Sequence, residues 1–163
     1  MPEVELPLPV VFFFRVKIDN ESVLFQEVKG LEFQLDVQEV CGGGDNSTIY
    51  YLPKKKKYPD LVLCRALAKK NEKFYAWCSK HLDNSEGFLN IELKNFQILL
   101  LGVKNPKEPQ QGTSENVEEE ILAVWSVKGA YPYKWSMNNL DAMKNEIAIE
   151  TVSLKVQSIT REQ

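Results

Sequence analysis

The stretch LEFQLDVQ, residues 31–38, alternates apolar and polar side chains more regularly than any other part of the chain. Its odd-numbered positions are all apolar, and its even-numbered positions are all polar. A period of two is the spacing of a β-strand, because successive side chains of a strand point to opposite faces. The stretch therefore predicts a strand with one apolar face and one polar face.

A second alternating stretch lies upstream, from Phe12 to Ile18, and predicts another strand. It is followed by Asp19–Ser22, which are residues that favour turns. An extended stretch then runs from Val23 to Val28. Two extended stretches joined by a short turn predict a β-hairpin.

The rest of the chain contains further strand patterns and one helical pattern. Strands are predicted over residues 61–63, 88–101, 121–127 and 151–157. Phe74, Trp77 and Cys78 instead follow helical spacing and form one apolar stripe. We predict one helix over Asn71–Leu82, in which the Asn71 side chain caps the first free backbone N–H groups.

The segments between these elements are predicted to be loops, turns or other irregular structure. Met1–Pro9 contains three prolines and predicts a flexible N-terminal arm, and residues from about 103 to 120 predict a polar insertion. The others are a glycine-centred loop at 41–47, a lysine run at 54–57 in or beside a loop, a bend at 131–133 and a helical turn at 138–144. Roughly six or seven strands and one helix predict a mainly β fold, an antiparallel β-barrel or sandwich. We expect a single domain over residues 1–163.

The composition excludes several classes of protein. Of the 163 residues, 26% are charged and the net charge is -3, so no basic excess points to nucleic acid or to an anionic membrane. No apolar run is long enough to cross a bilayer, and no membrane insertion is expected. The apolar run Val10–Phe14 follows Glu3 and Glu5 and lacks a cleavage site, so we expect cytoplasmic synthesis without a signal peptide.

The cysteines and the single histidine give no sign of a reactive site. Cys41, Cys64 and Cys78 are odd in number and far apart, which argues against a disulfide framework or a zinc site. His81 has no second histidine beside it, and no GxSxG, HExxH, Walker A or GxGxxG motif occurs. We therefore expect no catalytic residue, no metal and no cofactor, and we predict that the chain is not an enzyme.

Two features leave more than one interpretation open. Four consecutive lysines, Lys54–Lys57, could bind phosphate, lie free in solvent, or meet an acidic surface on a partner or a neighbouring copy. The three tryptophans, Trp77, Trp125 and Trp135, could line a ligand cavity, although core packing is the commoner use of tryptophan at such spacing.

Several segments, taken in order, resemble the tail-tube protein family of contractile phages and phage-derived injection systems. They are FRVKID at 14–19, FQEVKGLE at 25–32, GGDN at 43–46 with Leu52-Pro53, KYPDLVL at 57–63 with RAL at 65–67, AYPYKW at 130–135 after Trp125, and LDA at 140–142 with NEIAIETVSL at 145–154. Each is ordinary alone, but their order over about residues 12–156 is specific. The chain departs from the family pattern at Cys41, in the lysine run and in the length of the polar insertion.

This resemblance implies a small β-barrel or sandwich with one helix. Members assemble into hexameric rings that stack into a hollow inner tube, inside a contractile sheath, with baseplate and cap proteins at its ends. The lumen carries protein or DNA cargo, and no cofactor or catalysis is implied. A tube initiator or terminal paralogue is an alternative, and a monomeric small-molecule-binding β-barrel is an alternative of another class.

The resemblance also suggests which residues contact neighbouring subunits. The candidates are Gly43, Gly44, Asp45, Asn46, Lys57, Tyr58, Asn145, Glu146 and Glu150. For the last three residues, local hydrogen bonding at the entry to a strand is an equal alternative to a contact between rings or with the sheath. Deleting Gly43–Lys56 is expected to leave a folded monomer that cannot form rings.

Overall fold

The computed structural model describes residues 12–44, 47–67, 72–83, 91–103, 119–138, 143 and 147–162. These residues form ten strands and one helix, which confirms the antiparallel β fold with a single helix. The strands are β1 Phe12–Ile18, β2 Glu21–Phe25, β3 Glu27–Lys29, β4 Gln34–Cys41, β5 Ile49–Lys57, β6 Leu61–Ala66, β7 Lys94–Val103, β8 Glu119–Met137, β9 Ile149–Lys155 and β10 Ser158–Arg161, and the helix is α1 Lys73–Leu82. The strand number exceeds the six or seven predicted, partly because the lysine run belongs to a strand and residues 158–161 form another.

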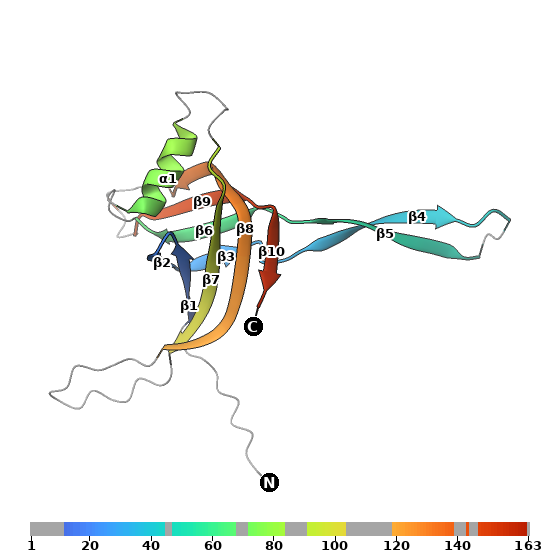
Figure 1. Cartoon of the computed structure of the whole chain (residues 1–163), viewed down its shortest axis with the longest axis horizontal. Coiled ribbons are helices and arrows are strands. Elements are labelled where there is room, and N and C mark those ends of the chain that lie inside the picture. The colour runs from blue at the N-terminus through green and yellow to red at the C-terminus, as the bar shows by residue number, and fades with distance from the viewer. Residues whose placement is uncertain are drawn as a thin grey trace, which may run out of the picture.

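Eight of the strands form one antiparallel sheet in the order β2-β1-β7-β8-β9-β6-β3, with β10 paired to β8. The first and last strands of this order, β2 and β3, are separated in the chain only by Gln26. The Gln26 backbone N–H donates to the carbonyl oxygen of Cys64 in β6 at 2.9 Å. The two ends of the sheet therefore meet in one bent segment, and the sheet curls into a barrel (Figure 1).

The predicted first hairpin is present as β1 and β2. Its two-residue turn consists of Asp19 and Asn20, whose φ angles are 46° and 64°. Positive φ at both turn residues matches the twist of the adjoining strands, and Asp and Asn tolerate that conformation better than most residues.

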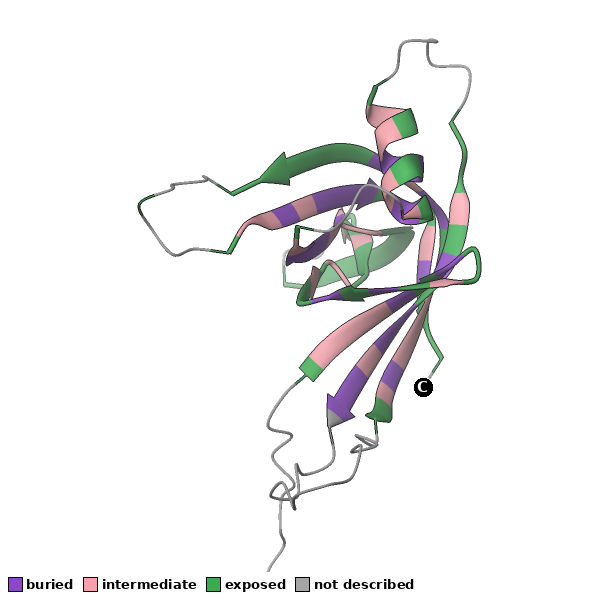
Figure 2. Ribbon diagram, turned by 90° about the vertical axis from the view of Figure 1, so that its left-hand side faces the viewer, coloured by how far each residue is buried: buried purple, intermediate pink, exposed green. Residues whose placement is uncertain are grey.

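Helix α1 packs against the barrel and contributes to its core. Phe74, Trp77 and Cys78 are buried on its inner side, as their spacing predicted. The Phe74 ring meets the Phe25 ring edge to face, with centroids 5.5 Å apart. Buried residues concentrate where the strands and the helix meet (Figure 2). The predicted cap, Asn71, lies outside the described residues; Glu72 holds the N-cap position and makes no capping hydrogen bond with its side chain.

Strand β8 corrects one prediction. The sequence Tyr131-Pro132-Tyr133 was expected to form a bend, but it lies inside this 19-residue strand. The register with β9 shifts between Pro132 and Lys134, so an irregularity in the ladder absorbs the proline without ending the strand. Through its length, β8 pairs with β7 and β10 in one part and with β9 in another.

Three other predicted segments lie largely outside the residues that the structure describes. The N-terminal arm and most of the polar insertion are not among the described residues, although Val103 ends β7 and Glu119–Glu120 begin β8. Of the helical turn predicted at 138–144, the structure describes only Asn138 and Met143.

Strands β4 and β5 form a separate two-stranded sheet. In Figure 1 they project sideways from the barrel as a long ribbon, which we call the arm (residues 34–57). Strand β4 contains most of the regular alternation of residues 31–38, yet its apolar residues Leu35 and Val37 are exposed, with Val37 at 60%. The alternation thus identified a strand correctly, while the apolar face of that strand is left uncovered by the rest of the described chain.

Candidate assembly interface

The arm exposes large apolar side chains along its length. Every residue of β5 is exposed. The exposed large hydrophobic residues of the arm and its base are Phe33, Leu35, Val37, Ile49, Tyr50, Tyr51 and Leu52, all at least 44% exposed. Residues opposite each other in the register share a face, so Val40 and Tyr50 lie on one face, and Cys41 and Ile49 on the other. Because contiguous exposed apolar surface marks interaction sites, the arm is the leading candidate interface.

The lysine run lies in strand β5 and not in a loop, which corrects the prediction. Lys57 forms an ion pair with Asp36 across the arm at 2.7 Å. The ammonium of Lys56 lies over the Phe33 ring, 5.1 Å from its centroid. Two of the four lysines therefore contact their own arm near its base, and these exposed contacts contribute little stability.

The tip of the arm contains the predicted glycine turn. Gly44 has φ 101°, a conformation that glycine adopts without strain. Gly43 has nothing within 4 Å of where a Cβ atom would lie. The neighbouring candidates, Asp45 and Asn46, lie outside the described residues.

The base of the arm is held to the barrel at Gly30 and Asp60. Gly30 has φ 88°, and a Cβ atom there would lie 2.2 Å from the carbonyl oxygen of Asp60. The Asp60 carboxylate accepts hydrogen bonds from the Tyr133 hydroxyl and, at 2.5 Å, from the Lys155 ammonium. Strands β8 and β9 thus hold the point where the chain leaves the arm, and Tyr58, between the arm and this point, packs against the core.

Replacing Gly30 with alanine is expected to destabilise the barrel by at least about 1–2 kcal/mol, since a left-handed φ alone costs an L-residue that much. The close approach to Asp60 adds to this cost. Gly43→Ala is the matched control, because a methyl group there meets nothing, and it should stay within about 0.5 kcal/mol of the parent. Urea unfolding midpoints of the three chains test this, and equal midpoints would contradict it.

The contacts of Asp60 predict a pH dependence. Hydrogen bonds from Lys155 and from Tyr133 lower the pKa of this carboxyl group below its usual value of 3.8. A lowered folded-state pKa gives stability that is present above the unfolded-state pKa and is lost as the pH falls through the folded-state pKa.

Asp60→Asn should therefore lower the melting temperature at pH 6 modestly, by the equivalent of about 1 kcal/mol or less, because both charged side chains of the contact are partly exposed to solvent. The difference from the parent should shrink as the pH falls below 4. Thermal unfolding followed by circular dichroism from pH 7 to pH 2.5 measures it; a difference that stays constant down to pH 2.5 would refute this role for Asp60.

A buried ion pair lies beneath the helix. Glu150 is 2% exposed, and its carboxylate accepts a hydrogen bond from the Nε of Arg65, whose own exposure is 5%. A second nitrogen of the same guanidinium donates to Glu72, at the helix N-cap, at 2.5 Å. The carboxylate of Glu150, one of the candidate contacts, therefore binds within its own barrel and does not reach the surface of the described chain. Asn145 and Glu146 lie outside the described residues.

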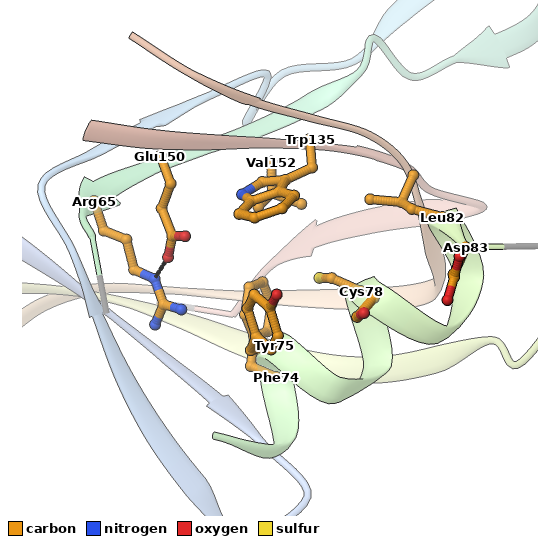
Figure 3. Close-up of a pocket in the computed structure, with 10 residues that line it drawn as sticks. Arg65, Phe74, Tyr75, Cys78, Leu82, Asp83, Trp135, Glu150 and Val152 are labelled. Carbon is orange, nitrogen blue, oxygen red and sulfur yellow. Dashed lines mark hydrogen bonds and ion pairs between the residues drawn. The ribbon is translucent and has the colours of Figure 1, made fainter. Parts of the chain in front are cut away.

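A groove of about 210 Å³ lies between α1 and the strands that carry this ion pair (Figure 3). Tyr75 and Trp135 face each other across it, with ring centroids 5.7 Å apart. Trp135 is 39% exposed, so the core position expected of it is wrong, whereas Trp77 is buried. Burial raises the pKa of the Cys78 thiol, which also lines the groove, to about 12. This thiol stays protonated at neutral pH and is a poor nucleophile.

Both ring nitrogens of the single histidine, His81, lie within hydrogen-bond distance of backbone groups. Its Nε2 accepts from the backbone N–H of Glu92 at 2.8 Å, and its Nδ1 lies 2.8 Å from the Trp77 carbonyl oxygen. The Trp77 indole N–H donates to the Glu92 carbonyl oxygen at 3.0 Å. Two helix side chains thus bind both backbone groups of Glu92. Within the described residues, no cluster of three or more acidic, cysteine or histidine side chains could hold a metal, and no helix could span a membrane.

Sequence reasoning missed the residues that anchor the arm and the helix. The folded sheet brings Asp60 together with Tyr133 and Lys155, which are distant from it in sequence. It likewise brings Arg65 to Glu150. Asp60 and Tyr133 did lie in the quoted segments KYPDLVL and AYPYKW, but nothing in the spacing indicated that they bind each other.

Comparisons with known proteins agree with this geometry. A chain in the cryo-EM structure of the sheath/tube terminator of an extracellular contractile injection system, PVC, in its extended state, is 25% identical; 98% of this chain and 99% of that chain are covered, with a TM-score of 0.69. A chain in the tube-terminating cap of the anti-feeding prophage is also 25% identical, over 92% and 87% of the two chains, with a TM-score of 0.68.

A chain in the PVC sheath-tube complex has the same fold, at 23% identity and a TM-score of 0.68, over 98% of this chain and 93% of that chain. No curated protein matches the sequence significantly. The sequence model of the family described as T4-like virus tail tube protein gp19 matches residues 10–160. That match spans nearly the whole barrel and arm, so the chain belongs to the T4-like tail tube protein family.

Proposed function

We propose that the chain is a structural subunit of the inner tube of a phage-like contractile injection system. Copies form hexameric rings, and the rings stack around a lumen that carries protein or DNA cargo. The observation that carries this proposal is the arm, which exposes apolar side chains on both faces of a two-stranded ribbon. An isolated two-stranded hairpin is marginally stable in water, so an arm of this composition is best explained by contact with another molecule.

The arm supplies one of the two surfaces that a closed ring of subunits requires. A closed ring needs a head-to-tail interface, in which one surface of a subunit meets a different surface of the next. A projecting arm on one side of a barrel supplies the first of these surfaces. Of the candidate contacts, Gly43, Gly44 and Lys57 lie on the arm and Tyr58 directly follows it, so we assign them to this interface.

The proposed partners beyond other copies are sheath subunits and baseplate or cap proteins. The similar structures include a sheath-tube complex, a tube-terminating cap and a sheath/tube terminator. The last two support a second candidate function, a terminal subunit that ends the tube. Such a subunit would form a single ring and would not polymerise.

The ionisable side chains near the helix are engaged by other groups of the protein, as expected for a structural role without catalysis. Arg65 and Glu150 bind each other, and both nitrogens of His81 are engaged with backbone groups. We propose that the chain is not an enzyme, and that it is made in the cytoplasm and then assembled into the particle.

Negative-stain electron microscopy of the purified, concentrated chain tests the function. Rings that stack into tubes are expected for a main tube subunit, and single rings for a terminal subunit. A uniform population of monomers that persists after baseplate components are added would overturn both.

A further inference from the structure

The arm has two outer edges, and they differ in chemistry. Strands β4 and β5 pair with each other in a sheet of two, so each has one edge that no described strand covers. Unpaired strand edges present backbone N–H and C=O groups that can pair with a strand of another molecule. The two edges are therefore the places where the arm could extend a sheet.

The edge of β5 carries the features that block such pairing. Pro53 stands in the middle of the strand and has no N–H to donate, and Lys54–Lys57 follow it. Proline and lysine on an edge strand are devices by which proteins prevent unwanted edge pairing. Strand β4 has neither lysine nor proline in its eight residues. The outer edge of β4 is therefore the edge of the arm that can pair with another strand.

The register shows which β4 groups face outward. Pro53 lies opposite Val37. Because a proline cannot donate to its partner strand, this pair must be of the non-hydrogen-bonded kind, in which the backbone groups of both residues point away from each other. Pairs alternate along an antiparallel ladder, so Glu39 and Cys41 also direct their N–H groups outward, and Gln38 and Val40 direct theirs toward β5.

We propose that the outer edge of β4 pairs with the outer edge of β10 in a neighbouring copy of this chain. Eight residues of β4 reach roughly 27 Å, which carries the edge beyond its own barrel. Strand β10 pairs only with β8 among the described strands, so it offers a free edge on a different surface, as a head-to-tail ring requires. Glu39 on β4 and Arg161 on β10 bear opposite charges, and the Arg161 guanidinium lies over the Trp125 ring of its own barrel, 5.9 Å from the centroid. The inference rests on the proposed tube function.

Glu39→Pro and Tyr51→Pro form a matched pair of variants, because the two residues lie opposite each other and both direct their N–H groups outward. Each proline removes one outward donor without breaking the ladder inside the arm. Glu39→Pro should weaken assembly by about tenfold or more, while Tyr51→Pro should change it little. Glu39→Ala and Tyr51→Ala separate loss of the side chain from loss of the backbone donor. Sedimentation and electron microscopy of the full-length chains measure assembly, and circular dichroism confirms that each variant folds.

Hydrogen exchange gives an independent measurement on the parent chain. On assembly, the amides of Val37, Glu39 and Cys41 should gain protection together with amides of β10, while the Tyr51 amide stays unprotected.

Two results would overturn the choice of the β4 edge: assembly of Glu39→Pro at parental levels, or an equal loss of assembly in both proline variants. Protection of β4 amides without protection of β10 amides would overturn the choice of partner strand. A parent chain that never assembles, even with baseplate components, would overturn the tube function and this inference together.

Discussion

Glu150→Ala is expected to lower the free energy of unfolding by about 3–5 kcal/mol, because it leaves the guanidinium of Arg65 buried without its closest counter-charge. Arg65 cannot turn to solvent easily, since its guanidinium lies 5.4 Å from the ring centroids of both Phe25 and Phe74. The remaining partner, Glu72, is 36% exposed and binds a different nitrogen. The ion pair joins β6 to β9 beneath the helix, so its loss should weaken the whole barrel.

Glu72→Ala is the matched control for this prediction. It removes the other carboxylate from the same guanidinium, but at a half-exposed position where ion pairs contribute about 1 kcal/mol or less. Urea-induced unfolding of the parent and the two variants, followed by tryptophan fluorescence, measures both effects. If the two substitutions had equal cost, the buried pair would not be the interaction that holds the helix side of the barrel together.

Replacing residues 35–56 by Asn-Gly is expected to abolish ring and tube formation while leaving a folded monomer. Gln34 and Lys57 lie opposite each other at the base of the arm, so a two-residue turn can join them, and Asn-Gly is the sequence that such turns favour. These boundaries refine the deletion of Gly43–Lys56, which would remove most of β5 and leave β4 without its partner.

The barrel should tolerate this change, because no residue of the arm belongs to the core cluster. An unchanged melting temperature and unchanged circular dichroism would establish that the monomer folds. Normal tubes formed by the shortened chain would show that the arm is not the assembly interface. Loss of folding would show instead that the barrel depends on the arm for its stability, although no arm residue belongs to the core cluster.

Local sequence determined most of the strands, the single helix and the hairpin turn. Period-two alternation in β1 and helical spacing of Phe74, Trp77 and Cys78 are properties of neighbouring residues, and they survive into the structure. The turn at Asp19 and Asn20 was likewise readable, because it depends on the conformations that these two residues tolerate. The order of quoted segments also indicated the family, which the match over residues 10–160 confirms.

Tertiary structure alone decided what those elements face. The alternation in residues 31–38 identified a strand, but no periodicity can say whether an apolar face is covered by the same chain or left for another; Val37 proved to be exposed. The partners Arg65 and Glu150 are 85 residues apart in sequence, and Lys155 and Asp60 are 95 apart. Pairings over such separations depend on the register of several strands at once, so they follow from the closed barrel and not from any local pattern.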